Sequence, residues 1–331
     1  MLNLATATVG ERVQETLRVV ERAERTRSGG EPYVVLTLGN ATGQIDTEPI
    51  WSNLLDSGWA DGAIRGALVQ VIGDLTRYTA RGSSRRQLKL SAPLRALPRD
   101  SQPLDDFIPH VNESSEQLWD RLDRVRHEIR SDPLRAVLAL FFDDEPFRLR
   151  FERMPASIGG HHSMRGGLLL HVGEVAYIGR TIARAMRAHV DLVVAGALLH
   201  DIGKVEAYDV TWDGFVRTPA GFLVEHVVLG SLMLQRRLAE AGQDLCTFAQ
   251  QLELQHLILS HHGRLEYGSP VRPLTAEAEI LYQADQASAR TTAVQDGLAD
   301  DEAFRDGATF GDTSRLWLAE GRPLWRRDGG W

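Results

Sequence analysis

The apolar pattern of the sequence changes once, and this change limits the fold more than any other feature. Up to Leu97 the apolar residues form short alternating or β-rich runs, such as PYVVLTLGNATGQID, separated by glycine-containing turns. Such runs are typical of strands. Four prolines between residues 93 and 109 then interrupt every periodic pattern. After Ser114 the spacing becomes helical, as in SSEQLWDRLDRVRHEIR. We therefore expect a β unit followed by an α unit.

The lengths of these patterns indicate the domain organisation. A chain of 331 residues is long enough for two domains. The β-rich part predicts a small barrel over residues 1–98, and the proline-rich stretch predicts a linker over residues 99–115. A helical domain over residues 116–299 and a C-terminal tail over residues 300–331 complete the prediction. Within the helical domain we expect helices over residues 167–187, 192–200, 223–241, 248–261 and 276–294, with a short hairpin or loop at residues 205–221.

Composition excludes several classes of protein. One cysteine, Cys246, rules out an internal disulfide and makes a reducing cytoplasm the expected compartment. The first residues lack a basic start followed by an apolar stretch, and the longest apolar run, residues 192–199, is too short to span a bilayer. We therefore expect neither secretion nor membrane insertion. The net charge is −8, yet the first 100 residues carry 13 basic and 11 acidic side chains, so the two halves are expected to do different jobs.

Histidines are concentrated in the helical part of the chain. Nine of the eleven lie between residues 161 and 262. A single helical histidine is more often a core or surface residue than a ligand, which is the interpretation we prefer for His189 and His256. A cluster is different, because imidazoles and carboxylates together form a ligand set for first-row divalent metals. The cluster therefore predicts a metal centre.

The segment LLHDIGK, residues 198–204, is the sharpest element of this cluster. It places His200 beside Asp201 where an apolar helix ends at a glycine. Neighbouring side chains within a helix diverge by about 100°, but at a helix end, where the backbone turns, both can face one ion. His171 and Asp285 each stand among apolar residues of other predicted helices. A carboxylate there is costly to bury without a partner, so these four residues are predicted to hold an ion.

Two further histidines extend the predicted centre. His226 in EHVVLG and His261 in LSHHG are expected to hold a second ion, with Asp201 as the bridge. A two-ion centre can activate water and hold a phosphoryl group. The alternative is that His226, His261 and His262 are ordinary helix residues.

The order His, His-Asp, His, His-His, Asp resembles that of the HD-domain superfamily of metal-dependent phosphohydrolases. The segments HHSMRGGLLLH, GALLHDIGK, EHVVLG and SHHGRLEYGSP carry the resemblance. With the preceding β-barrel, they resemble the bacterial YhaM-type 3′-to-5′ exoribonucleases, which join an OB-fold domain to an HD domain. The resemblance covers residues 8–295. It implies a multidomain chain with an N-terminal all-β OB-fold barrel followed by an all-α HD-domain helical bundle.

The resemblance also implies roles for individual residues. Lys204 corresponds to the lysine after the HD dipeptide, where a cation can neutralise a substrate phosphate; the alternative is a surface lysine at a helix C-terminus. The metal ligands implied are His171, His200, Asp201, His226, His261 and Asp285. The catalytic residues implied are Asp201, Lys204 and His262, and the substrate contacts are His161, His162, Arg165 and Lys204.

The barrel is the predicted nucleic-acid-binding part. An OB-fold can bind single strands by stacking bases on aromatic side chains in a basic groove. The candidate residues are Tyr33, Trp51, Tyr78, Arg85 and Lys89. The barrel departs from the family pattern at Asn40, where an aspartate is usual.

These observations predict a metal-dependent 3′-to-5′ exonuclease. Its expected substrate is single-stranded nucleic acid, RNA before DNA, and its products are nucleoside 5′-monophosphates. One or two divalent ions are expected, with manganese first and iron, magnesium, zinc and cobalt left open, as is a homo-oligomer. The alternatives are an HD phosphohydrolase of nucleotides or cyclic dinucleotides with a regulatory barrel, a di-iron oxygenase, and a binding module without catalysis.

Overall fold

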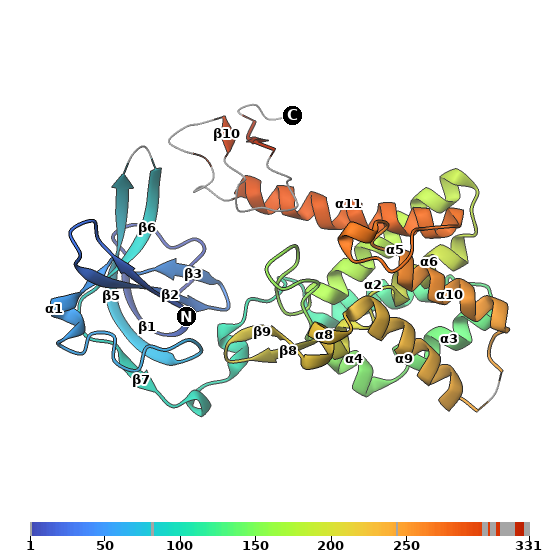
Figure 1. Cartoon of the computed structure of the whole chain (residues 1–331), viewed down its shortest axis with the longest axis horizontal. Coiled ribbons are helices and arrows are strands. Elements are labelled where there is room, and N and C mark those ends of the chain that lie inside the picture. Colours follow the sequence, from blue (N-terminus) through green and yellow to red (C-terminus); the bar gives the residue numbers. More distant parts are fainter. Residues whose placement is uncertain are drawn as a thin grey trace.

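The structure, a computed structural model, separates the chain into a β body and a helical body (Figure 1). It describes residues 2–80, 83–242, 244–299, 304, 309–311 and 322–327. The predicted tail, residues 300–331, therefore lies for the most part outside the described residues. Of the helices that the structure describes, none is both long enough and apolar enough to cross a bilayer.

The β body is a nearly closed barrel of the OB type. Its strands are β1 (Arg12–Thr26), β2 (Pro32–Asn40), β3 (Gly43–Asp46), β4 (Ile50–Trp51), β5 (Leu68–Ala80), β6 (Ser83–Leu90) and β7 (Arg95–Leu97). The antiparallel order is β3-β2-β1-β5-β6, with β4 on β2 and β7 on β5. A parallel bridge between Thr47 and Leu88 joins the two ends of the sheet. The predicted OB-fold barrel is thus confirmed.

The long strand β1 closes the barrel because it serves two neighbours. Its first half, Arg12–Arg18, pairs with β5, and its second half pairs with β2. The register shifts between Val19 and Glu21, and such a bulge bends a strand and increases its twist. Val13 and Leu17 point into the barrel core and are fully buried.

Asn40, the departure from the family pattern, has a structural use at the end of β2. Its side chain is 1% exposed. Asn40 Nδ2 donates to the Leu2 carbonyl at 3.0 Å, and Asn40 Oδ1 accepts from the Thr42 amide at 2.9 Å. An amide side chain can donate one hydrogen bond and accept another, whereas an ionised carboxylate could only accept.

The second body is helical. The helices after the barrel are α2 (Ser115–His127), α3 (Asp132–Phe142), α4 (Glu145–Phe151), α5 (Gly167–Met186), α6 (Val190–Leu199), α7 (Lys204–Ala207), α8 (Pro219–Leu223), α9 (His226–Glu240), α10 (Phe248–Ser260) and α11 (Ala276–Ala299). A hairpin of β8 (Tyr208–Thr211) and β9 (Gly214–Arg217) follows α7, and a short helix α1 (Ser52–Leu55) lies in the barrel. The predicted all-α bundle is confirmed.

One predicted helix begins later than the sequence indicated. The sequence predicted a helix over residues 223–241, but Leu223 is the last residue of the short helix α8, and α9 runs from His226 to Glu240. Glu225 between them has φ +66, a left-handed conformation that no helix interior accommodates. The break starts a new helix at His226, and it therefore places this histidine at a helix N-terminus.

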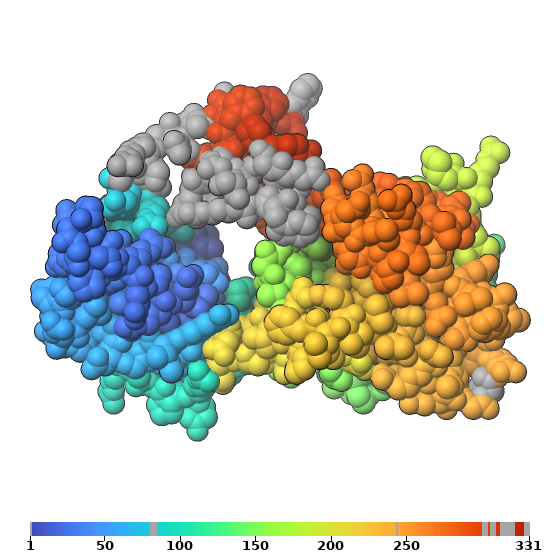
Figure 2. Space-filling view, in the orientation of Figure 1, coloured from blue at the N-terminus to red at the C-terminus, as the bar shows by residue number. Residues whose placement is uncertain are grey.

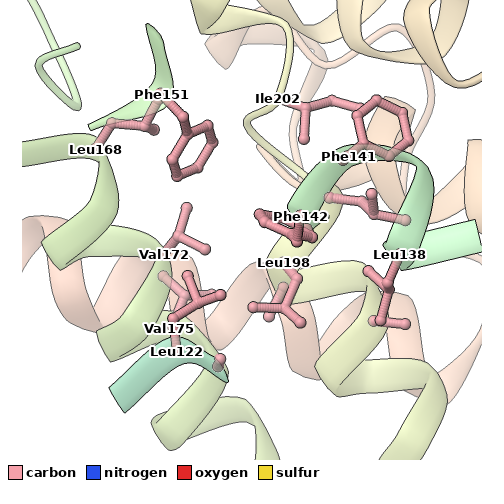
Figure 3. Close-up of a cluster of buried hydrophobic side chains, with 14 of the residues drawn as sticks. Leu122, Leu138, Phe141, Phe142, Phe151, Leu168, Val172, Val175, Leu198 and Ile202 are labelled. Atoms are coloured by element: carbon pink, nitrogen blue, oxygen red, sulfur yellow. The ribbon is translucent and has the colours of Figure 1, made fainter. Parts of the chain in front are cut away.

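Helix α6 is the centre of the helical core. Seven of its ten residues are buried. Figure 3 shows Leu198 and Ile202, on either side of the HD dipeptide, among phenylalanines of α3 and α4 and apolar residues of α5. Because these anchors are fully buried, the turn that carries His200 and Asp201 is held in one position.

The two bodies meet at the β8–β9 hairpin, which touches the barrel (Figure 2). Arg18 of β1 is 3% exposed at this junction. Its Nε donates to the Phe107 carbonyl at 3.3 Å, and its Nη1 donates to the Trp212 carbonyl at 3.0 Å. Arg65 Nη2 also donates to the Asp213 carbonyl at 3.2 Å. The hairpin is therefore hydrogen-bonded to the barrel at its tip.

Candidate metal centre and active site

A close backbone contact assembles the HD turn against α9. Gly203 follows Asp201 in the turn between α6 and α7. A Cβ at position 203 would lie 2.0 Å from the His226 carbonyl and 2.5 Å from the Gly230 amide nitrogen. Only glycine permits this approach, which brings Asp201 and His226 together.

Four of the predicted ligands converge from three parts of the bundle. His171 comes from α5, His200 and Asp201 from the end of α6, and Asp285 from α11. His171 Nε2 lies 3.1 Å from Asp285 Oδ1 and 3.6 Å from Asp201 Oδ2. His200 Nε2 lies 3.2 Å from Asp201 Oδ2. All four side chains are buried, so ring nitrogens and carboxylate oxygens share one water-poor space.

The other oxygen of Asp201 faces the remaining two predicted ligands. Asp201 Oδ1 lies 3.5 Å from His226 Nε2 and 3.7 Å from His261 Nε2. These separations are too long for hydrogen bonds. Asp201 Oδ1 and both ring nitrogens of His226 are buried without a hydrogen-bond partner among the described residues.

The donor set fits divalent cations. Two ligand atoms that are each about 2.1 Å from one ion, at about 90–110°, are about 3.0–3.4 Å apart. The separations around Asp201 are close to this range. An unpartnered buried carboxylate oxygen is costly, and a cation between it and the histidines would remove that cost. The residues therefore suit one or two ions with Asp201 between them.

The histidine rings are held by their second nitrogens. His200 Nδ1 donates to the Ala197 carbonyl and His261 Nδ1 donates to the Ile258 carbonyl, each at 2.7 Å. His171 Nδ1 instead lies 2.9 Å from Ser288 Oγ. Ring orientation by such contacts is usual for metal-ligating histidines. Ser288 was missed by the sequence reasoning, although it stands three residues after Asp285 and thus on a neighbouring part of the same helix face.

Lys204 lies beside the centre and remains charged. Its Nζ is 2.6 Å from Asp201 Oδ2. Burial alone would lower the pKa of Lys204, but the Asp201 carboxylate outweighs burial and raises the pKa above its usual value. Burial would likewise raise the pKa of Asp201, but the neighbouring His200 and the Lys204 cation hold that pKa well below its usual range. The alternative of a surface lysine does not hold, because Lys204 is 6% exposed.

A cavity of about 170 Å³ opens at this centre. The residues that line it include Asp201, Lys204, His161, His262, Tyr267 and Arg290. Burial lowers the pKa of His161 to about 2, so its ring is neutral at pH 7. Tyr267 and Arg290 were missed by the sequence reasoning, because nothing in their local pattern separates them from ordinary surface residues.

Two predicted substrate contacts are not among the residues that line the cavity. His162 Nε2 lies 3.1 Å from Glu174 Oε2, and Arg165 forms an ion pair with Asp105 of the linker. The structure therefore brings His161, Lys204 and His262 to the cavity and gives His162 and Arg165 protein partners.

Four of the five predicted nucleic-acid-binding residues of the barrel form two pairs. Tyr33 and Trp51 lie with ring centroids 5.0 Å apart. Arg85 lies over the ring of Tyr78, with its guanidinium carbon 5.5 Å from the centroid. Lys89, on β6, is exposed.

The barrel, the bundle and the His/Asp centre define a hydrolase of the HD class, and the comparisons agree. The HD domain family model matches residues 168–290. The chain is 30% identical to the 3′-5′ exoribonuclease YhaM of Bacillus licheniformis, over 85% of this chain and 86% of that protein. It is 28% identical to the YhaM of Oceanobacillus iheyensis (98% and 96%) and 29% identical to that of Bacillus subtilis (96% of each).

The chain belongs to the YhaM family of 3′-5′ exoribonucleases. No solved structure matches it. The predicted family, fold class and hydrolase class are thus confirmed.

Proposed function

We propose that this chain removes nucleotides from the 3′ end of single-stranded RNA and releases nucleoside 5′-monophosphates, using one or two divalent cations. The observation that carries the proposal is the convergence of four predicted ligand histidines on the two oxygens of Asp201, with Asp285 against His171, beside a cavity. Manganese is the first candidate ion. The 3′-5′ polarity and the RNA substrate come from the names of the YhaM relatives.

The cations would supply a water of lowered pKa and positive charge for the phosphate. His171, His200, Asp201 and Asp285 would hold one ion, and His226 and His261 would complete a second. Lys204 Nζ, fixed by Asp201 at 2.6 Å, would offset negative charge on the scissile phosphate. Neutral His161, whose ring nitrogens have no hydrogen-bond partner among the described residues, would contact the phosphate or sugar.

His262 would move a proton at the leaving group. His262 Nδ1 donates to the Tyr267 carbonyl at 2.8 Å, so Nε2 is the nitrogen that can gain and lose a proton. His262 also lines the cavity. An imidazole in this position can protonate the leaving oxygen.

The barrel would deliver the strand to the helical domain. The Tyr33–Trp51 pair offers aromatic faces on which bases can stack, and Arg27 lies over Trp51 with its guanidinium carbon 5.8 Å from the ring centroid. Stacking of this kind tolerates any base sequence. The Tyr78–Arg85 pair and Lys89 add further contacts for the polyanion.

The test measures the length of a 5′-labelled single-stranded RNA, and of its DNA counterpart, after incubation with the protein and either Mn²⁺ or a chelator. We expect a ladder that shortens from the 3′ end of the RNA, disappears with chelator and is absent for Asp201→Ala. Asp209→Ala, an exposed aspartate of β8, is the matched control and should keep full activity. Intact oligonucleotides alongside consumed free nucleotides, or full activity of Asp201→Ala, would contradict the proposal.

A further inference from the structure

A chain of side chains behind His171 connects the predicted metal centre to Glu174. Ser288 of α11 is 4% exposed and stands between the two. Ser288 Oγ lies 2.9 Å from His171 Nδ1 and 2.6 Å from Glu174 Oε2. Glu174 Oε2 also lies 3.1 Å from His162 Nε2. The series His162–Glu174–Ser288–His171 therefore spans α5, α11 and the loop before α5.

The direction of each hydrogen bond in this series follows from the groups present. An ionised carboxylate can only accept hydrogen bonds, so Ser288 Oγ and His162 Nε2 both donate to Glu174. The Ser288 hydroxyl has a single proton, which it donates to Glu174. Its oxygen must therefore accept a hydrogen bond from His171 Nδ1. His171 Nε2 is then the unprotonated nitrogen, and it is the one that faces Asp285 and Asp201.

This arrangement is suited to a cation. A lone pair on His171 Nε2, 3.1 Å from a carboxylate oxygen of Asp285, is repelled unless a positive charge lies between them. The neutral imidazole with a free Nε2 is the form that binds metals.

His171 differs from His200 and His261 in the group that accepts the hydrogen bond from Nδ1 and so leaves Nε2 unprotonated. His200 and His261 donate through Nδ1 to backbone carbonyls of their own helices, at residues 197 and 258. Any sequence with a histidine at those helix ends has such carbonyls. His171 depends on two side chains, one of them 117 residues away in sequence. Its orientation is therefore open to change by substitution.

We propose that Ser288 and Glu174 are positioning residues that hold His171 Nε2 toward the cation, and that His162 fixes Glu174 in place. The inference rests on the metal centre proposed above. It also assigns His162 to the support of a ligand, where the sequence predicted a substrate contact. His162 has a left-handed backbone conformation, with φ +46, at the position where its ring contacts Glu174.

The test measures Mn²⁺ binding by isothermal titration calorimetry, without RNA, for the wild-type chain, Ser288→Ala, Glu174→Gln and the double variant. Loss of such a supporting contact typically costs about 10- to 100-fold in metal affinity. We expect a loss of this size for Ser288→Ala and a smaller one for Glu174→Gln, whose amide oxygen still accepts. The double variant should bind like Ser288→Ala alone, because the two residues act in series.

Ser231→Ala is the matched control, since it removes a buried hydroxyl from α9 and should leave Mn²⁺ affinity unchanged. Thermal melting of each metal-free variant establishes that it is folded. Wild-type affinity in folded Ser288→Ala, or additive losses in the double variant, would overturn the inference and leave the proposed function standing. A wild-type chain that binds no divalent cation would overturn both.

Discussion

Lys204 shows what a single residue contributes to this site. It is one of only two lysines among 37 basic residues, and it is buried with its Nζ 2.6 Å from Asp201 Oδ2. Its cation faces the same cavity as the predicted metal ligands. A fixed charge in a water-poor cavity stabilises developing charge more strongly than one in water.

Lys204→Met should lower kcat for RNA by about 10²- to 10³-fold and leave the ligand set intact. Steady-state kinetics measure the first effect, and Mn²⁺ titration checks the second. Lys89→Met is the matched control, because it removes the other, exposed lysine and should change KM at most. A wild-type kcat for Lys204→Met would contradict the catalytic role.

At the scale of elements, the decisive contact is the one between the HD turn and the start of α9. Helix α6 ends at Leu199, and Gly203 then lies against the backbone of residues 226 and 230. This contact sets the distance between Asp201 and His226, so the second half of the predicted centre depends on it.

Gly203→Ala should therefore separate the turn from α9. The added Cβ meets the His226 carbonyl at 2.0 Å, and relieving such an overlap costs about 1–3 kcal/mol. We expect a lower melting temperature and fewer Mn²⁺ ions bound per chain. Gly173→Ala, where the Cβ meets nothing within 4 Å, should melt at or above the wild-type temperature. An unchanged Mn²⁺ stoichiometry in Gly203→Ala would refute this account.

At the scale of the whole molecule, the β8–β9 hairpin links the barrel to the HD turn. The hairpin starts directly after α7, which carries Lys204, and its tip is held by Arg18 of the barrel. We propose the domain boundaries of the sequence analysis, at residues 98, 115 and 299, as the limits of the two bodies. On this view Arg18 fixes their relative position.

Arg18→Met should weaken that fixation by removing the donors to the Phe107 and Trp212 carbonyls. Two linked binding parts gain affinity from a fixed geometry, so KM for long RNA should rise by about 10-fold or more. kcat for a dinucleotide, which is too short to reach the barrel, should stay the same. Arg12→Met, on the same strand and paired with exposed Asp74, is the control. An equal loss of activity on long RNA and on the dinucleotide would contradict the proposal that Arg18 fixes the relative position of the two bodies.

The sequence by itself determined the order of the two bodies and the types of residue at the predicted metal centre. Apolar periodicity is a local property, so it predicted the barrel and the bundle. The ligands could be predicted because a cluster of histidines and carboxylates among apolar residues has few other uses. The start of α9 at His226 was predicted three residues too early, because apolar spacing does not reveal the left-handed backbone of Glu225.

Only the tertiary structure decided which distant residues are in contact, among them those that touch the predicted ligands. Ser288 and His171 are 117 residues apart, and Arg18 and Trp212 are 194 apart. It also gave His162 and Arg165 protein partners in Glu174 and Asp105. Such partners depend on how the helices and the barrel pack in space. The local sequence pattern does not predict the distance between segments that are so far apart in the chain.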